Sequence, residues 1–155
     1  MGGRKLTAVL AGAAALVLGV TVPASAAPSR SDLEVVRLDP EAAPPGGTTT
    51  VHGFVANLGP DRTGSPFTVL LTVPNGFTFR GPYFPTDCLA LAGGHTLTCT
   101  FGAGLPRYRT ATVLAPVQVD GGLPPGTKAE GQVTVVSPDD TNPANNSTPF
   151  TLSVS

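Results

Sequence analysis

Strict alternation of apolar and polar residues is the feature that most constrains the fold of this chain. In the run 96–101, Leu97, Cys99 and Phe101 fall on one face of an extended chain, and the run 110–119 repeats the pattern over ten residues. Successive side chains of a strand point to opposite faces, so a period of two predicts strands with one buried face. The 19 glycines and 17 prolines interrupt every stretch that a helix would need. We therefore expect an all-β protein.

The expected strands are bounded by clusters of Gly, Pro, Asn and Asp. They cover 33–38, 48–58, 67–73, 77–80, 96–101, 110–119, 129–136 and a last run in which Phe150, Leu152 and Val154 share a face. Gly53, inside the second strand, indicates a bulge or close packing. Short strands with one buried face each pack most economically as two sheets face to face. We predict an antiparallel β-sandwich of seven to eight strands.

The first 26 residues have the pattern of a cleaved secretory signal peptide. Arg4 and Lys5 precede an apolar run over 6–22, and Ala24 and Ala26 form a small-residue cleavage site. A membrane anchor is the alternative, but the run is short and poor in large side chains. We expect a short linker over 27–31 and one β-sandwich domain over 32–155. The product is predicted to be a single domain that is secreted, or loosely associated with the cell surface.

The charge of the exported part excludes some partners. Removing Arg4 and Lys5 from the nine basic residues leaves seven against ten acidic ones, a formal charge of −3. A nucleic-acid partner normally needs a clustered basic face, and docking on anionic membranes needs net positive charge. We expect neither a nucleic-acid partner nor membrane association after signal cleavage.

The two cysteines, Cys88 and Cys99, both lie in the exported part. In an oxidising compartment such a pair is most simply one disulfide, with Cys99 facing inward. A zinc site is the alternative, but it would need two more ligands, and only His52 and His95 are available. We predict a disulfide and no cofactor.

The order of several short segments is also informative. They are 55–60 (VANLGP), 71–77 (LTVPNGF), Cys88, 97–99 (LTC), the Gly126 turn and 140–146 (DTNPANN). This order resembles the DUF11-type repeat of bacterial, here actinobacterial-looking, exported proteins. The resemblance implies an immunoglobulin-like β-sandwich and suggests no catalytic residues. Such domains commonly occur in tandem as spacers, whereas this chain carries one copy, so the spacer role is not carried over.

Enzymatic chemistry lacks its usual ingredients in this sequence. No G-x-S-x-G segment is present, His52 falls within an expected strand, and His95 falls in a glycine-rich turn. Glycoside hydrolysis uses a pair of carboxyl groups, and glutamates that could supply them are sparse. We therefore expect that the protein is not an enzyme.

The turn before the last strand is the weak candidate for a metal site. Asp139, Asp140 and Asn142 could offer oxygen ligands to calcium. The alternative is structural, because Asp and Asn side chains bond to nearby backbone in turns and tolerate left-handed conformations. We favour the turn.

The candidate binding surface is the aromatic segment around Phe79, Arg80, Tyr83 and Phe84. Aromatic rings with an arginine are typical of binding hot spots. In the alternative, Phe79 fills the sandwich together with Phe77, while Tyr83 and Phe84 cover the disulfide. A second exposed candidate is 107–109 (RYR), whose alternative is a solvated turn.

The function predicted from these features is non-catalytic binding or adhesion outside the cell or at its surface. The partner would be an unknown protein, cell wall or polysaccharide. The alternative is a structural component that associates through sheet edges with itself or with another exported protein.

Overall fold

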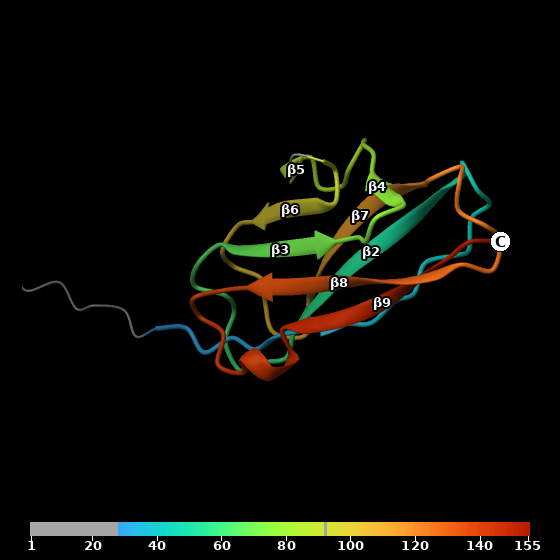
Figure 1. The fold of residues 1–155 in the computed structure, drawn as a ribbon. Helices are drawn as coiled ribbons and strands as arrows, with labels where there is room; N and C mark the ends of the chain where they lie inside the picture. Colours follow the sequence, from blue (N-terminus) through green and yellow to red (C-terminus); the bar gives the residue numbers. More distant parts are fainter. Residues whose placement is uncertain (1–27, 92) are drawn as a thin grey trace, which may run out of the picture.

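A computed structural model of the chain describes residues 28–91 and 93–155, so the predicted signal peptide lies outside the described residues. The described part contains nine strands and one turn of 3-10 helix (Figure 1). The strands are β1 (Leu33–Val36), β2 (Thr48–Asn57), β3 (Phe67–Thr72), β4 (Phe77–Phe79), β5 (Cys88–Ala90), β6 (Thr96–Phe101), β7 (Thr110–Val119), β8 (Lys128–Val136) and β9 (Ser147–Ser153), with η1 at Pro143–Asn145. No helix of the described part has the length and apolar character to cross a membrane.

The strands form two antiparallel sheets packed face to face. One sheet has the order β1-β2-β7-β4, and the other has the order β5-β6-β3-β8-β9 (Figure 1). The long strands β2 and β7 pair in continuous register, and β8 and β9 form the predicted closing hairpin. The predicted antiparallel β-sandwich is therefore confirmed.

The strand count differs from the prediction. β6 and β7 have the predicted bounds, whereas β5 was not predicted and brings the described total to nine. β5 is only three residues long, and its central Leu89 is 64% exposed, so no alternation marks it. It forms because its residues pair with β6 and carry Cys88.

The core is built from the faces that the alternation identified. On β7 every second residue from Ala111 to Val119 is buried, as are Phe150 and Leu152 of β9 and Val154 directly after it. Gly53 is opposite Val113 in unbroken register, and a Cβ there would lie 3.2 Å from the Val113 Cβ. Of the two readings of Gly53, close packing is the correct one.

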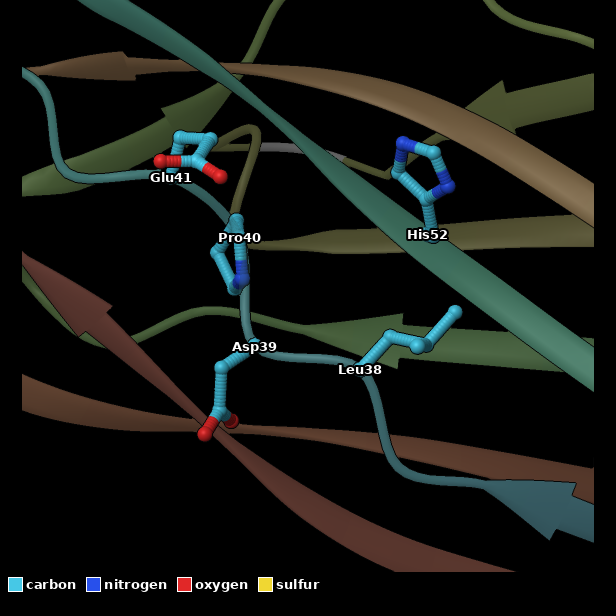
Figure 2. A pocket seen from close by; sticks show the side chains of 5 residues that line it. All are labelled: Leu38, Asp39, Pro40, Glu41 and His52. Carbon is cyan, nitrogen blue, oxygen red and sulfur yellow. The ribbon is translucent and has the colours of Figure 1, made fainter.

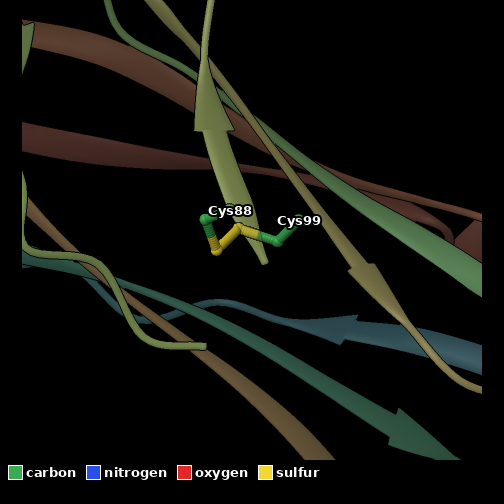
Figure 3. The surroundings of a disulfide bond; sticks show 2 residues. All are labelled: Cys88 and Cys99. Carbon is green, nitrogen blue, oxygen red and sulfur yellow. A yellow bond between two sulfur atoms is a disulfide. The ribbon is translucent and has the colours of Figure 1, made fainter. Parts of the chain in front are cut away.

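The predicted disulfide is present. Cys88 and Cys99 are direct partners in the β5–β6 register, and Cys99 is fully buried (Figure 3). The bond fastens the short edge strand β5 to the core.

Reducing this disulfide is expected to lower the free energy of unfolding by about 2 to 3 kcal/mol, because reduction frees a loop of 11 residues in the unfolded chain. Urea unfolding with and without reductant measures the difference. A Cys88→Ala, Cys99→Ala variant should show no effect of reductant. Equal stability of the oxidised and reduced wild type would contradict the prediction.

Candidate functional site

The turn before β9 uses its carboxylates to hold the chain together. Asp139 accepts hydrogen bonds from the backbone N–H and the hydroxyl of Ser65, at 2.6 and 3.2 Å. Asp140 accepts from the backbone N–H of Leu33 at 2.7 Å and of Asn142 at 2.8 Å. Over residues 28–91 and 93–155, no three His, Cys, Asp or Glu side chains gather as metal ligands. The structural alternative for this turn accounts for its composition.

The outer edges of β1 and β9 are covered by hydrogen bonds from loop residues. The Leu33 N–H that Asp140 accepts belongs to the outer edge of β1, and Thr141 donates its N–H to the Ser31 carbonyl just before β1. On β9, Asp39 accepts the Thr151 N–H at 2.8 Å, and Ala43 donates to the Ser153 carbonyl. Covered edges of this kind resist pairing with another chain.

A small pocket of about 230 Å³ lies beside the covered edge of β9. Leu38, Asp39, Pro40, Glu41 and His52 line it, and Figure 2 shows the Asp39 carboxylate pointing away from His52. The two acids and the histidine do not converge on a common point, so the pocket has no arrangement for acid–base chemistry.

Asp39 gives the stability of this edge a pH dependence. The hydrogen bond from the Thr151 backbone, and after it the one from Arg37, holds the pKa of Asp39 below its usual range. A depressed folded pKa means that the stabilisation is fully present above the unfolded pKa and is lost as pH falls through the folded one.

We therefore expect wild type to be more stable than Asp39→Asn at neutral pH, with a difference that shrinks once pH falls below about 4. Chemical unfolding of both proteins from pH 7 to pH 2.5 measures this. A difference that does not change with pH would contradict the assignment.

The aromatic segment separates into buried and exposed residues. Phe79 is only 2% exposed, so its proposed place on a binding surface was wrong: on β4 it alternates inward with Phe77 and fills the core. Tyr83 is half-buried against the core, and Arg80 is exposed. Phe84 is 57% exposed and exchanges two backbone hydrogen bonds with Leu114 of β7, at 3.0 and 2.8 Å.

Phe84 borders a cavity of about 480 Å³, which we call the edge groove. It lies between the edges of β6 and β7. Its lining comprises Phe67, Phe84, Pro85, Phe101, residues 102–106 and residues 110–112. Phe67 and Phe101 stack with ring centroids 5.1 Å apart, which gives the groove an aromatic wall.

The edge groove contains an open stretch of strand β7. The backbone groups of successive residues in an antiparallel strand point to alternate sides, so Thr112 and Thr110 face the same side as Leu114. Leu114 is bonded to Phe84, but within the described residues Thr112 and Thr110 have no hydrogen-bond partner on that side. This edge, unlike those of β1 and β9, has no covering group among the described residues.

A second cavity, of about 820 Å³, adjoins the edge groove at Pro106, which lines both. We call it the basic basin, because three of its lining residues are Arg30, Arg62 and Arg107. They come from three separate segments, so the sequence showed only the pair of arginines around Tyr108.

Asn57, at the end of β2, positions the loops that form both cavities. It is fully buried, and its side-chain amide donates to the carbonyls of Asp61 and Leu105, at 2.9 Å each. Its side-chain oxygen accepts from the N–H groups of Gly59 at 3.1 Å and Asp32 at 3.3 Å. The sequence placed Asn57 within an expected strand and within a resemblance motif, and did not indicate this role.

The start of the chain is attached at the same end. The Ser29 hydroxyl donates to the Arg62 carbonyl, the Arg30 N–H donates to Asp61 at 3.0 Å, and Ser31 is fully buried. Residues 28–30, which fall within the linker predicted over 27–31, thus form part of the basin wall.

Tyr108 has an unusual backbone conformation beside the basin. It is 67% exposed at a φ of 59°, a region that favours glycine, and the Arg107 guanidinium lies 4.3 Å from the centre of its ring. An exposed aromatic residue held in a disfavoured conformation is a common mark of a functional surface.

The fold is similar to that of several solved structures. A chain of the structure of the sixth cohesin from Acetivibrio cellulolyticus scaffoldin B, in complex with a Cel5 dockerin mutant, is 11% identical with a TM-score of 0.51, over 83% of this chain and 100% of that one. A non-cellulosomal cohesin from Archaeoglobus fulgidus is 13% identical with a TM-score of 0.51, over 80% and 91%. A variant of BcpA, the major pilin subunit of Bacillus cereus, is 12% identical with a TM-score of 0.54, over 80% and 38%.

A scan against protein-family models and a search of curated proteins each found no match. The resemblance to the DUF11-type repeat therefore stays a prediction. Identities this low show the fold alone. The chain is an antiparallel immunoglobulin-like β-sandwich.

Proposed function

We propose that this protein is an exported, non-catalytic module that binds a partner outside the cell or at its surface through the edge groove. The observation that carries the proposal is Phe84, more than half exposed beside the open edge at Thr110 and Thr112. An unpaired strand edge next to an apolar cavity suits β-augmentation, in which a peptide adds as a further strand.

Other features support this assignment. The Cys88–Cys99 disulfide fits an oxidising compartment, as the signal-like pattern of residues 1–26 also does. The edges of β1 and β9 are covered, whereas the stretch of β7 in the edge groove is open to a partner strand. The divergent acids and histidine around the small pocket favour a binding role over a catalytic one.

The alternative is assembly with a second copy through the same open edge. Two β7 edges facing each other would form a continuous sheet across a dimer. Light scattering at high protein concentration separates the two functions: a Phe84-dependent dimer supports assembly, and a monomer supports binding of a different partner.

Replacing Phe84 with alanine is expected to lower capture of the partner by at least about tenfold, because the side chain offers apolar area next to the open edge. Immobilised wild type and variant are compared for capture from the culture supernatant and cell-wall fraction of the source organism. Leu89→Ala is the matched control, since Leu89 is 64% exposed on β5, outside the groove lining.

Both variants should unfold within about 1 kcal/mol of wild type, because exposed side chains contribute little to stability. Equal capture by wild type and Phe84→Ala, with the fold intact, would contradict the proposed function.

A further inference from the structure

The edge groove continues into a basic surface that is not neutralised. Among the described residues, Arg62, Arg107 and Arg109 form no ion pair, and the only acid of the basin, Asp61, is 3.6 Å from Arg30. The exported part as a whole is acidic, so this end is a local reversal of charge. A binding partner that fits it must carry negative charge.

The direction of β7 shows where the basic surface lies relative to the open edge. Residues 77–84 run antiparallel to β7, with Phe77 opposite Val119 and Phe84 opposite Leu114. A strand added beyond Phe84 in the same direction would pass Thr112 and then Thr110. It would next approach the turn over 106–109 that precedes β7, where Pro106 lines both cavities and Arg107 lines the basin.

We infer that the occupant of the edge groove is an extended acidic peptide segment of another protein, which pairs with Thr112 and Thr110 and delivers carboxylates to Arg107 and Arg62. This inference rests on the proposed function and adds the chemistry of the partner. In the antiparallel orientation, the acidic residues follow the paired residues toward the C-terminus of the segment. Exposed Tyr108, with Arg107 over its ring, is next to Pro106 and Arg107 in the chain and would supply the aromatic contact.

A peptide fits this surface better than a nucleic acid or an anionic polysaccharide does. The open edge offers alternating backbone donors and acceptors, which only a second polypeptide backbone matches along its length. Binding of a nucleic-acid single strand relies on several stacking rings along a basic groove. The basin lining contains no aromatic residue, and of the groove's three phenylalanines only Phe84 is exposed.

The test is selection of a random dodecapeptide library on the immobilised wild-type protein. We expect selected peptides to combine a β-branched or aromatic stretch with at least two Asp or Glu on its C-terminal side. Binding should weaken about tenfold in Arg62→Gln, Arg107→Gln, which removes two exposed ion pairs. Lys128→Gln is the control, because it removes the positive charge of an exposed lysine at the start of β8, away from the site. It should leave binding unchanged. The Thr110 and Thr112 amides should become protected from hydrogen exchange on binding.

The outcomes separate this inference from the proposed function. Peptides that need Phe84 but show no acidic enrichment, or that are insensitive to the two arginine substitutions, would overturn the inference and leave the proposed function standing. A lack of any Phe84-dependent peptide would count against both. Equal binding of a polygalacturonate or an oligothymidylate, without protection of Thr110 and Thr112, would overturn the inference in favour of general anion binding.

Discussion

Replacing Asn57 with alanine is expected to lower the free energy of unfolding by about 3 to 5 kcal/mol. The side chain is fully buried and makes four hydrogen bonds to the backbone of Asp32, Gly59, Asp61 and Leu105. Alanine removes all four and leaves one buried and three partly buried backbone groups unpaired, at about 1 kcal/mol for each bond and more for an unsatisfied buried group. Urea unfolding measures the loss.

The matched control is Asn75→Ala, in the exposed turn before β4, which should change stability by less than about 0.5 kcal/mol. Because Asn57 positions the loops of the edge groove and the basic basin, its variant should also lose partner capture. A stability loss below about 1 kcal/mol for Asn57→Ala would show that these loops keep their positions without it.

Replacing Gly131 with alanine is expected to destabilise the protein by about 3 kcal/mol or more. Gly131 of β8 faces Phe150 of β9, and an added Cβ would lie 2.3 Å from the Cζ of that ring and 2.7 Å from the carbonyl oxygen of Thr72. Phe150 is fully buried, so its ring can move only by displacing the core, and overpacking of this kind is costly.

A double substitution tests the cause. Leucine at position 150 lacks the Cζ and Cε2 atoms that meet the new Cβ, so Gly131→Ala, Phe150→Leu should lose less stability than the sum of the two single changes. Gly121→Ala, where an added Cβ meets nothing within 4 Å, is the control and should be nearly neutral. Strict additivity would contradict a clash between Gly131 and Phe150 as the cause.

The candidate site was only partly predictable from the sequence. The aromatic segment was identified, but Phe79 is in the core while Phe84 is exposed. Local pattern could not separate them, because Phe84 lies outside any strand and its position depends on pairing with Leu114. The basic basin was missed because Arg30, Arg62 and Arg107 are far apart in the chain.

The sequence alone determined all the described strands but β5, their buried faces and the pairing of the two cysteines. These follow from local alternation, from glycine and proline as strand boundaries, and from the presence of a single cysteine pair. The tertiary structure alone decided that three arginines line one cavity, that Asn57 joins three loop segments, and that β7 keeps an open edge beside Phe84. Each of these depends on which strands are neighbours and in which register, and such long-range pairing has no signature in the local order of residues.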